Sequence, residues 1–362
     1  MQADGSPEAR SPSTAAIRPT KQSPRMHASL TAIEYALPRH VLDNGQLANE
    51  FSDWTAEKIL AKTGIRQRHI AGADECASDI AVTAADRLLD SGVCPRSEID
   101  YLLYCTQSPD YFLPTTACLL QHRLGLAPTC GALDFNLGCS GYVYGLGLAE
   151  GLIESGQATR LLLITADTYS KFIHPLDKSV RTLFGDGATA TLISARESDV
   201  PLVGPFVFGT DGTGANNLIV PTGGMRRPTV ANAVVVSDEN GNSRTVNNLY
   251  MNGTEIFNFT LRVVPETVGR LLTRARLAMG DIDLFIFHQA NKFMLDHLQR
   301  KLKVPSDRFW VSMGDTGNTV SSTIPIALKC ALDAGKVRPG HRLMLVGFGV
   351  GYSWGATLVQ WV

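Results

Sequence analysis

The sequence predicts an α/β protein built from two halves of similar design. Short apolar runs typical of buried strands alternate with helical segments from residue 29 to the end of the chain. The second half repeats the strand–helix order of the first, and no stretch of disordered composition separates the two. We therefore expect an internal duplication whose halves share one core around layered sheets.

Composition narrows the classes of protein that fit. The 362 residues are 44% hydrophobic and 19% charged, and the formal net charge of −1 gives no global field for nucleic acid or an anionic membrane. No apolar run is long enough to span a bilayer. The seven cysteines form no CxxC pair, so neither a metal site nor a disulfide framework is indicated. A cytoplasmic protein without nucleic-acid or membrane partners is the simplest interpretation.

Residues 1–28 differ from the rest of the chain. They are rich in Ser, Pro, Ala and charge and lack the apolar core of a secretory signal, so we expect a disordered tail. Residues 29–200 form the first predicted half. Its strands are predicted at 29–37, 99–106, 131–137, 159–167 and 187–195, and its helices at 77–92, at 115–125 and directly after Cys139.

Residues 201–362 form the second predicted half. It begins with a long helix over 253–279 and continues with a shorter helix over 292–302 and another over 321–335. Strands are predicted at 283–289, 309–313, 342–349 and 355–362.

Cys139 lies where a predicted strand turns into a helix, in the stretch LDFNLGCSGYVYGLGL. A buried structural cysteine is the common alternative for a thiol among apolar residues. A thiol on the first turn of a helix, however, is exposed to the positive end of the helix dipole, which favours the thiolate. The flanking Gly138 and Gly141 would let the turn present the sulfur at the strand end. We expect Cys139 to be a nucleophile.

Two further polar residues occupy comparable junctions. His288 ends the apolar strand DLFIFHQ and is followed by Gln289, Asn291 and Lys292, which indicates a strand emerging into a polar pocket. Asn318 lies in GDTGNTVSSTIPIAL, where a simple turn is the alternative to an amide aimed from a helix junction. The run GFGVGYSWG at 347–355 predicts a hairpin, whose backbone N–H groups could reach a reacting oxygen.

In this order the motifs resemble those of the β-ketoacyl-ACP synthase III family, which belongs to the thiolase-like condensing enzymes. The resemblance covers residues 29–362. It is carried by TGIRQRHI at 63–70, GCSGYVYGL around Cys139, LFGDGATA at 183–190, HQAN at His288, GNT at Asn318 and GFGVGYSWG at 347–355. The resemblance implies a thiolase-like fold of two duplicated βαβαβ-type halves in five αβαβα layers, and a homodimer.

The resemblance also implies a reaction. Cys139 would take an acyl primer from a thioester, with an oxyanion hole formed by the backbone N–H groups of Cys139 and Val350. A malonyl thioester would then lose carbon dioxide while His288 and Asn318 donate hydrogen bonds to the enolate oxygen. A neutral imidazole and an amide suit that role because they donate to developing negative charge without losing a proton. The substrates would be acyl-CoA or acyl-carrier protein, and no cofactor or metal is expected.

Departures from the family pattern bear on the substrate. Many relatives have a tryptophan that stacks on the CoA adenine where this chain has Lys58. Lys62 and Lys178 stand in place of arginines that face the nucleotide. Together with Lys292 these lysines are the expected contacts for a CoA or carrier phosphate. Leu113 replaces a phenylalanine of the acyl pocket and would admit a longer primer, and Val350 replaces a glycine and narrows the space beside the thiol.

Carrier docking has two readings. Arg262, Glu266, Arg270 and Arg274 recur every fourth residue along the long helix, so they share one face. The first reading is a solvated face with local ion pairs. The second is a docking surface for an acidic carrier centred on Arg270 and Arg274, helped by cations of the following helix, namely Lys292, Arg300, Lys301 and Lys303.

Two other functions compete with the condensing enzyme. An acyltransferase of the same fold would pass the acyl group from Cys139 to an oxygen, nitrogen or sulfur nucleophile. A non-catalytic partner would only bind acyl chains or complete a dimer. Retention of Cys139, His288 and Asn318 favours condensation, whereas the primer and the pathway stay open.

Overall fold

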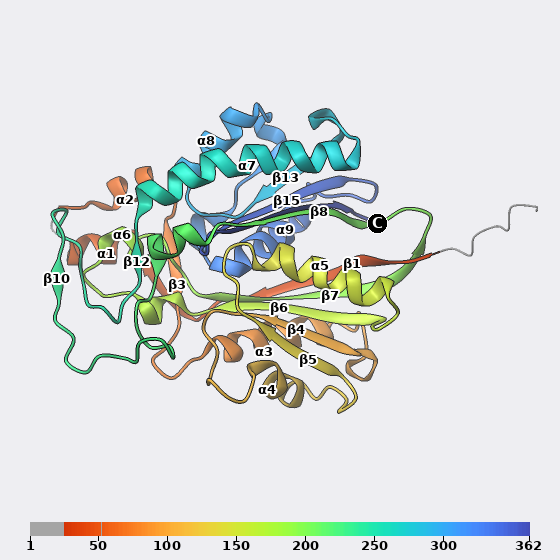
Figure 1. The fold of residues 1–362 in the computed structure, drawn as a ribbon, viewed down its shortest axis with the longest axis horizontal. Coiled ribbons are helices and arrows are strands. Elements are labelled where there is room, and N and C mark those ends of the chain that lie inside the picture. Colours follow the sequence, from red (N-terminus) through yellow and green to blue (C-terminus); the bar gives the residue numbers. More distant parts are fainter. Residues whose placement is uncertain (1–24, 52) are drawn as a thin grey trace, which may run out of the picture.

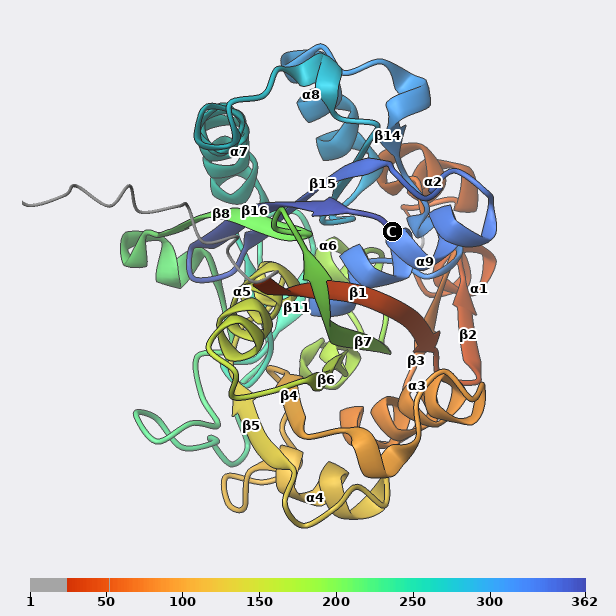
Figure 2. The same ribbon diagram turned by 90° about the vertical axis from the view of Figure 1, so that its right-hand side faces the viewer.

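The computed structural model describes residues 25–51 and 53–362, and most of the expected N-terminal tail lies outside this range. Two five-stranded sheets are stacked with helices between them and further helices on both outer faces, which gives five layers (Figures 1 and 2). The predicted five-layer αβαβα architecture is confirmed.

The first sheet has the strand order β1-β7-β6-β4-β5. β4 pairs in parallel with both β5 and β6, whereas β7 runs antiparallel to β6 and β1. The strand expected from Ser29 begins earlier, at Arg25, because β1 continues its pairing with β7 up to Ser198. The strands are β1 (Arg25–Ala36), β4 (Tyr101–Cys105), β5 (Gly131–Phe135), β6 (Arg160–Asp167) and β7 (Gly187–Ser198).

The second sheet, ordered β14-β13-β15-β16-β8, repeats this pattern of parallel and antiparallel neighbours, as an internal duplication requires. Its first strand, β8, was not predicted, because Gly204 and Pro205 interrupt the apolar run there. The strands are β8 (Val203–Thr210), β13 (Leu284–Phe287), β14 (Phe309–Trp310), β15 (Arg342–Gly349) and β16 (Ser353–Gln360).

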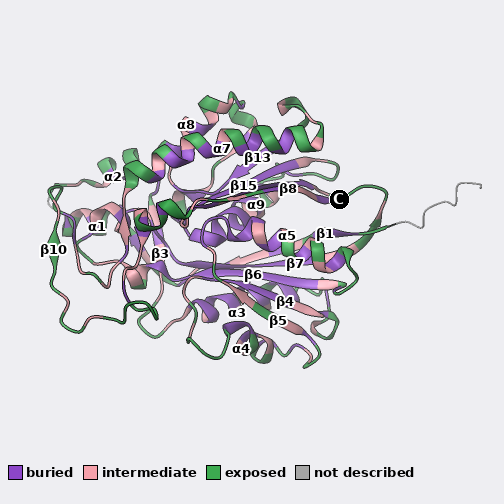
Figure 3. Cartoon of the chain, viewed as in Figure 1, coloured by how far each residue is buried: buried purple, intermediate pink, exposed green. Residues whose placement is uncertain are grey.

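Two helices, α5 (Gly141–Glu154) and α9 (Thr323–Asp333), lie between the sheets and are largely buried (Figure 3). One core cluster joins side chains of both sheets to both helices, including Leu103, Leu146, Ile286 and Ile324, so the halves share a core. The outer helices are α3 (Ala77–Asp90) and α4 (Thr116–Arg123) on one face, and α7 (Gly253–Ala275) and α8 (Lys292–Leu302) on the other (Figure 1).

The remaining elements gather at one end of the layers, on the left of Figure 1. Within the described ranges, no helix is both long and apolar enough to cross a membrane. These smaller elements are β2 (His40–Asp43), α1 (Asn44–Glu50), α2 (Ala56–Thr63), β3 (Gln67–Ile70), α6 (Lys178–Arg181), β9 (Leu218–Ile219), β10 (Val236–Ser237), β11 (Ser243–Arg244) and β12 (Tyr250–Met251).

Candidate active site

Cys139 lies between β5 and α5 and is buried, with 4% of its surface exposed. Its neighbour Ser140 is linked to Ser353 at the start of β16 by a hydrogen bond of 2.8 Å between the hydroxyls. The nucleophile turn of the first half is therefore fastened to the second sheet.

The glycines around Cys139 are explained by close approach. A Cβ atom on Gly141 would lie 2.3 Å from Sγ of Cys105, and one on Gly347 would lie 2.8 Å from the carbonyl oxygen of Cys139. Cβ atoms are never observed so close to other atoms, so larger residues would displace the turn. The glycine-rich hairpin at 347–355 thus packs directly against the nucleophile turn.

The protonation state of the thiol differs from the sequence-based expectation. Cys139 precedes the helix by two residues, since α5 begins at Gly141. Burial raises the pKa of the Cys139 thiol to about 12, with a smaller contribution from the carboxylate of Asp167, while the backbone N–H groups of Val350 and Cys139 lower it. The helix end does not make Cys139 a thiolate as expected, because desolvation raises the pKa of the thiol by more than nearby N–H groups lower it.

His288 directly follows β13 and is 2% exposed. Its backbone N–H donates to the carbonyl of Val346 at 2.8 Å, and its ring nitrogen Nδ1 lies 2.6 Å from Oγ1 of Thr323. Burial lowers the pKa of His288 to about 3, so the imidazole is neutral at physiological pH.

Asn318 is held by the LFGDG segment. Its backbone N–H donates to the carbonyl of Leu183 at 2.9 Å, and its own carbonyl accepts from Gly185 at 3.0 Å. The side-chain oxygen of Asn318 accepts from the backbone N–H of Val320 at 2.9 Å, and the side-chain nitrogen, which is the donor, lies 3.5 Å from the carbonyl oxygen of Ala290. Val320 has a φ of 56°, a strained value for a β-branched residue.

Two other motifs, TGIRQRHI and LFGDGATA, hold together the loops around Cys139, His288 and Asn318. Arg68, in TGIRQRHI, is fully buried and donates to the carbonyls of Leu42 and Thr182. Asp186, in the FGDG segment, accepts from the backbone N–H groups of Ala71 and Ser170. The charged side chains of both motifs join loops, and Leu183 and Phe184 of the second motif also line the cavity described next.

Cys139, His288 and Asn318 line one cavity of about 70 Å³, together with Gly349 of the glycine hairpin. The structure thus brings the three predicted side chains to one small space. A thiol, a neutral imidazole and an amide can there act on one carbonyl centre.

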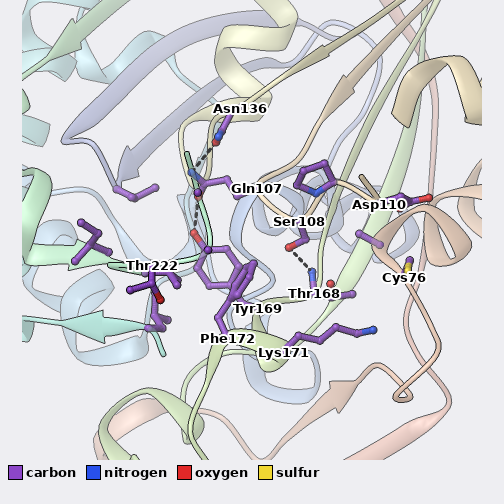
Figure 4. Close-up of a pocket in the computed structure, with 18 of the residues that line it drawn as sticks. Cys76, Gln107, Ser108, Asp110, Asn136, Thr168, Tyr169, Lys171, Phe172 and Thr222 are labelled. Atoms are coloured by element: carbon purple, nitrogen blue, oxygen red, sulfur yellow. Dashed lines mark hydrogen bonds between the residues drawn. The ribbon is translucent and has the colours of Figure 1, made fainter. Parts of the chain in front are cut away.

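A second, larger cavity of about 740 Å³ is lined by Gln107, Ser108, Asn136 and Thr168, among others (Figure 4). Leu218 lines both cavities, and Val350 lines the larger one. Gln107 and Tyr169, joined by a hydrogen bond, form part of its wall (Figure 4). Of these two cavities, Cys139 lines the small one, and the adjoining hairpin residues Gly349 and Val350 line the small and the large cavity respectively.

Three of the predicted phosphate-binding lysines surround the turn before α2. Lys178 forms an ion pair of 2.5 Å with Asp53, and Lys58 donates to the carbonyl of Asp53 at 2.8 Å. Lys62 lies 4.9 Å from the ring centroid of Trp54. Lys292, at the start of α8, packs against Gly64 at the end of α2 and pairs with Asp296 at 2.5 Å.

Trp54 is the residue that sequence reasoning missed. The family pattern has its tryptophan where this chain has Lys58, so no aromatic ring was expected here. Trp54 precedes the N-cap residue Thr55, and its ring lies near the ammonium groups of both Lys58 and Lys62, at 5.4 and 4.9 Å. An aromatic ring therefore does lie beside two of the predicted lysines. The sequence signal that could have revealed it is Trp54 itself, four residues before Lys58.

Three other predicted residues lie away from the two cavities. Leu113 is 85% exposed and lines neither of them within the described chain. Arg270 and Arg274 line a groove between α7 and β8, where Arg274 donates to the carbonyl of Phe206 at 3.0 Å. Arg270 lies about 25 Å along α7 from Gly253, which lines the small cavity, at about 1.5 Å per residue.

The fold and the Cys–His–Asn cavity define the class of thiolase-like condensing enzymes. Residues 133–212 match the family described as 3-oxoacyl-[acyl-carrier-protein (ACP)] synthase III, and residues 272–361 match the C-terminal family of the same name. The synthase III 3 of Streptomyces coelicolor is 36% identical over 92% of this chain and 96% of its own length. The synthase III of Caldanaerobacter subterraneus is 34% identical over 90% and 95%.

Solved structures of similar proteins lead to the same family. A crystal structure of a 3-oxoacyl-(acyl-carrier-protein) synthase III is 54% identical, with a TM-score of 0.91 over 92% of this chain and all of that one. The priming β-ketosynthase of the R1128 polyketide pathway is 29% identical, with a TM-score of 0.80 over 95% of this chain and 99% of that one. The chain belongs to the β-ketoacyl-[acyl-carrier-protein] synthase III family, as its motifs predicted.

Proposed function

We propose that this protein condenses an acyl primer with a malonyl thioester to give a 3-oxoacyl thioester. The observation that carries the proposal is the single cavity lined by Cys139, His288 and Asn318. A thiol alone would serve any acyl transfer. The adjacent imidazole and amide supply the two donors that a decarboxylating second step requires.

In the first half-reaction, Sγ of Cys139 attacks the primer thioester. The carbonyl oxygen becomes an oxyanion that accepts hydrogen bonds from the backbone N–H groups of Cys139 and Val350, both of which already face the sulfur. The carbon–sulfur bond to the donor breaks, and the proton of Cys139 leaves with the departing thiol. The high pKa of Cys139 means that this proton is lost during attack.

In the second half-reaction, the malonyl thioester enters the small cavity. Its carboxylate leaves as carbon dioxide, and the electron pair forms an enolate whose oxygen accepts hydrogen bonds from His288 and Asn318. The enolate carbon attacks the acyl group on Cys139, the carbon–sulfur bond breaks, and the released sulfur takes up one proton. Loss of either donor is expected to slow this step about 10²–10³-fold.

The primer's acyl chain is proposed to extend into the larger cavity beyond Val350. Its volume of about 740 Å³ falls within the usual range of small-molecule sites, and its walls include Phe172, Leu218 and Leu249. This favours primers longer than acetyl. The donor nucleotide or the carrier's phosphate is proposed to lie near Trp54, with Lys58, Lys62, Lys178 and Lys292 as its cations.

A homodimer is proposed from one unpaired edge of the first sheet. β5 is an edge strand with exposed Leu133, and the loop with Tyr111, Phe112 and Leu113 exposes three large apolar side chains. Leu113 lines neither of the two cavities described above, so it is proposed to meet an acyl chain bound to a second copy. Light scattering of the wild type and of Leu133→Asp would test the dimer.

An acidic carrier protein is proposed to dock on the outer helices α7 and α8, through Arg270 and Arg274 and the cations Arg300 and Lys301. All four side chains are exposed and basic. A cytoplasmic location is proposed because all seven cysteines are free thiols.

Intact-protein mass spectrometry tests the function. Wild type and Cys139→Ala would be incubated with a panel of acyl-CoAs and acyl-carrier proteins, followed by a malonyl donor. An adduct confined to the wild type and discharged with release of carbon dioxide is expected. An adduct that only alcohols, amines or thiols discharge would establish the acyltransferase alternative, and no adduct from any donor would favour the non-catalytic partner.

A further inference from the structure

The proposed condensation requires one particular form of His288. A neutral imidazole carries one proton, on either Nδ1 or Nε2, and only the protonated nitrogen can donate to an enolate oxygen. Nδ1 is turned toward Thr323, so the nitrogen left for the cavity is Nε2. The donor role therefore depends on what holds the proton on Nε2.

Thr323 is the group in contact with Nδ1. It is the first residue of α9 and is buried. Its hydroxyl oxygen lies 2.6 Å from Nδ1 of His288 and 3.1 Å from the carbonyl oxygen of Val320. A hydroxyl has one proton, so it donates to only one of these two acceptors.

The two distances distinguish the alternatives. Hydrogen bonds donated by a hydroxyl are typically about 2.5–3.0 Å long, whereas those donated by an N–H group are about 2.7–3.2 Å. The 2.6 Å contact with His288 fits a hydroxyl donor, and the 3.1 Å contact with Val320 is long for one. Of the two acceptors, Nδ1 is the nearer to the hydroxyl oxygen, and an Nδ1 that accepts this proton is unprotonated.

We propose that Thr323 is a positioning residue that donates its hydroxyl proton to Nδ1 of His288 and so keeps the ring proton on Nε2, facing Cys139 and Asn318. The effect of Thr323 on condensation rests on the proposed function. Its contact with His288 and the resulting tautomer do not. If the hydroxyl instead donated to Val320, Nδ1 would carry the proton and Nε2 would have none to offer.

The same short turn orients the second donor. The backbone N–H of Val320 occupies the side-chain oxygen of Asn318, and Thr323 occupies Nδ1 of His288. Ser321, between them, is anchored by its hydroxyl to the buried carboxyl group of Asp167. The turn from 318 to 323 thus sets the donor end of both side chains, which explains why it tolerates the strained φ of Val320.

The decisive experiment compares Thr323→Val with Thr323→Ser. Valine has the shape of threonine without the hydroxyl, and serine keeps the hydroxyl. Each protein would be labelled with ¹⁵N-histidine, and the ring signals of His288, assigned with His288→Asn, would report which nitrogen is protonated. Acyl loading of Cys139 and its discharge by malonyl-CoA would be timed separately by mass spectrometry.

We expect the Nε2–H form in the wild type and in Thr323→Ser, and a substantial Nδ1–H population in Thr323→Val. Loading should change less than twofold in both variants, whereas discharge should slow about 10–100-fold in Thr323→Val only. A wild-type Nδ1–H signal would overturn the proposal even if the valine variant failed to fold, as would unchanged tautomer and discharge in that variant. A wild type that loads acyl but ignores both malonyl-CoA and malonyl-carrier protein would refute the proposed function, leaving the tautomer result to stand by itself.

Discussion

A Cβ atom placed on Gly349 would lie 2.8 Å from both Cβ and Sγ of Cys139. The hairpin that carries Val350 therefore meets the nucleophile at a distance that only glycine permits. Gly349 has no positive φ, so its role is space and not backbone freedom.

The first prediction follows from this contact. Gly349→Ala should slow acyl loading of Cys139 at least tenfold, because the methyl group displaces either the sulfur or the hairpin that supplies the N–H of Val350. Loading rates from intact-protein mass spectrometry would measure the effect. Gly212→Ala is the matched control, since a Cβ there meets no atom within 4 Å. Equal loading by both variants would contradict the proposed oxyanion hole.

A second prediction concerns the thiol. With the pKa of Cys139 raised to about 12 by burial, the thiolate fraction should increase about tenfold for each pH unit across the neutral range. Alkylation by iodoacetamide should accelerate about a hundredfold between pH 7 and pH 9. Peptide mass spectrometry would follow Cys139, with the exposed Cys118 as an internal reference for the reagent. A rate that is flat over this range would mean that the thiol is already ionised.

The fold was predictable from sequence because its signals are local. Apolar strands such as 159–167 and the repeated strand–helix order were sufficient to predict the layered sheets and the internal duplication. β8 was not predicted because glycine and proline are typical of loops. Its strand conformation is set by its pairing with β16, which lies far away in the sequence.

The candidate site was predictable only in part. Cys139, His288 and Asn318 stand at strand–helix junctions with recognisable neighbours, and the fold brings all three together. The thiol's pKa and the Thr323 contact depend on burial and on atoms far apart in the chain, which no local pattern encodes. The ring of Trp54 beside Lys58 and Lys62 was missed because it lies four residues before the position where the family pattern has its tryptophan.

A third prediction concerns acid stability. Burial lowers the pKa of His288 to about 3 from an ordinary value of 6.5, so the unfolded chain binds the extra proton first as pH falls. Stability from this group is present above pH 6.5 and is lost toward pH 3. His288→Asn should therefore lose less stability than the wild type between about pH 6.5 and 4.5, by about 2–3 kcal/mol.

Calorimetric Tm values across this range would measure the difference. His297→Asn, on the outer helix α8, should follow the wild type. Burial raises the pKa of Asp167 from 3.8 to about 7, so its contribution has the opposite sign and is lost as pH rises. That group is common to all three proteins and cancels in the comparison. Parallel pH profiles for wild type and His288→Asn would refute the neutral buried imidazole.

A fourth prediction tests the cations beside Trp54. Lys62→Glu should raise the KM for acyl-CoA about tenfold with little change in kcat, because it places a negative charge where the nucleotide phosphates are proposed to bind. A short thioester without a nucleotide should be used equally well by variant and wild type. Lys336→Glu, beyond the C-terminal end of α9, is the control for surface charge. A similar KM for acyl-CoA in all three proteins would show that the nucleotide does not bind beside Lys62.

The last prediction separates the two readings of the long helix. If a carrier docks there, reversing both Arg270 and Arg274 to glutamate should raise the KM for malonyl-carrier protein about tenfold and weaken its dependence on salt. The KM for malonyl-CoA should stay unchanged, since Arg270 and Arg274 lie about 25 and about 32 Å along α7 from Gly253 at the cavity.

Arg300→Glu with Lys301→Glu would report on the neighbouring helix α8, whose first turn contributes Met294 to the cavity wall. A rise in KM for the carrier in this second variant only would place docking on α8 and leave Arg270 and Arg274 as a solvated face. Unchanged kinetics in both variants would contradict docking on either helix. Reduced salt dependence in both would instead make the two helices one continuous surface, because screening acts on every charge pair that the carrier forms.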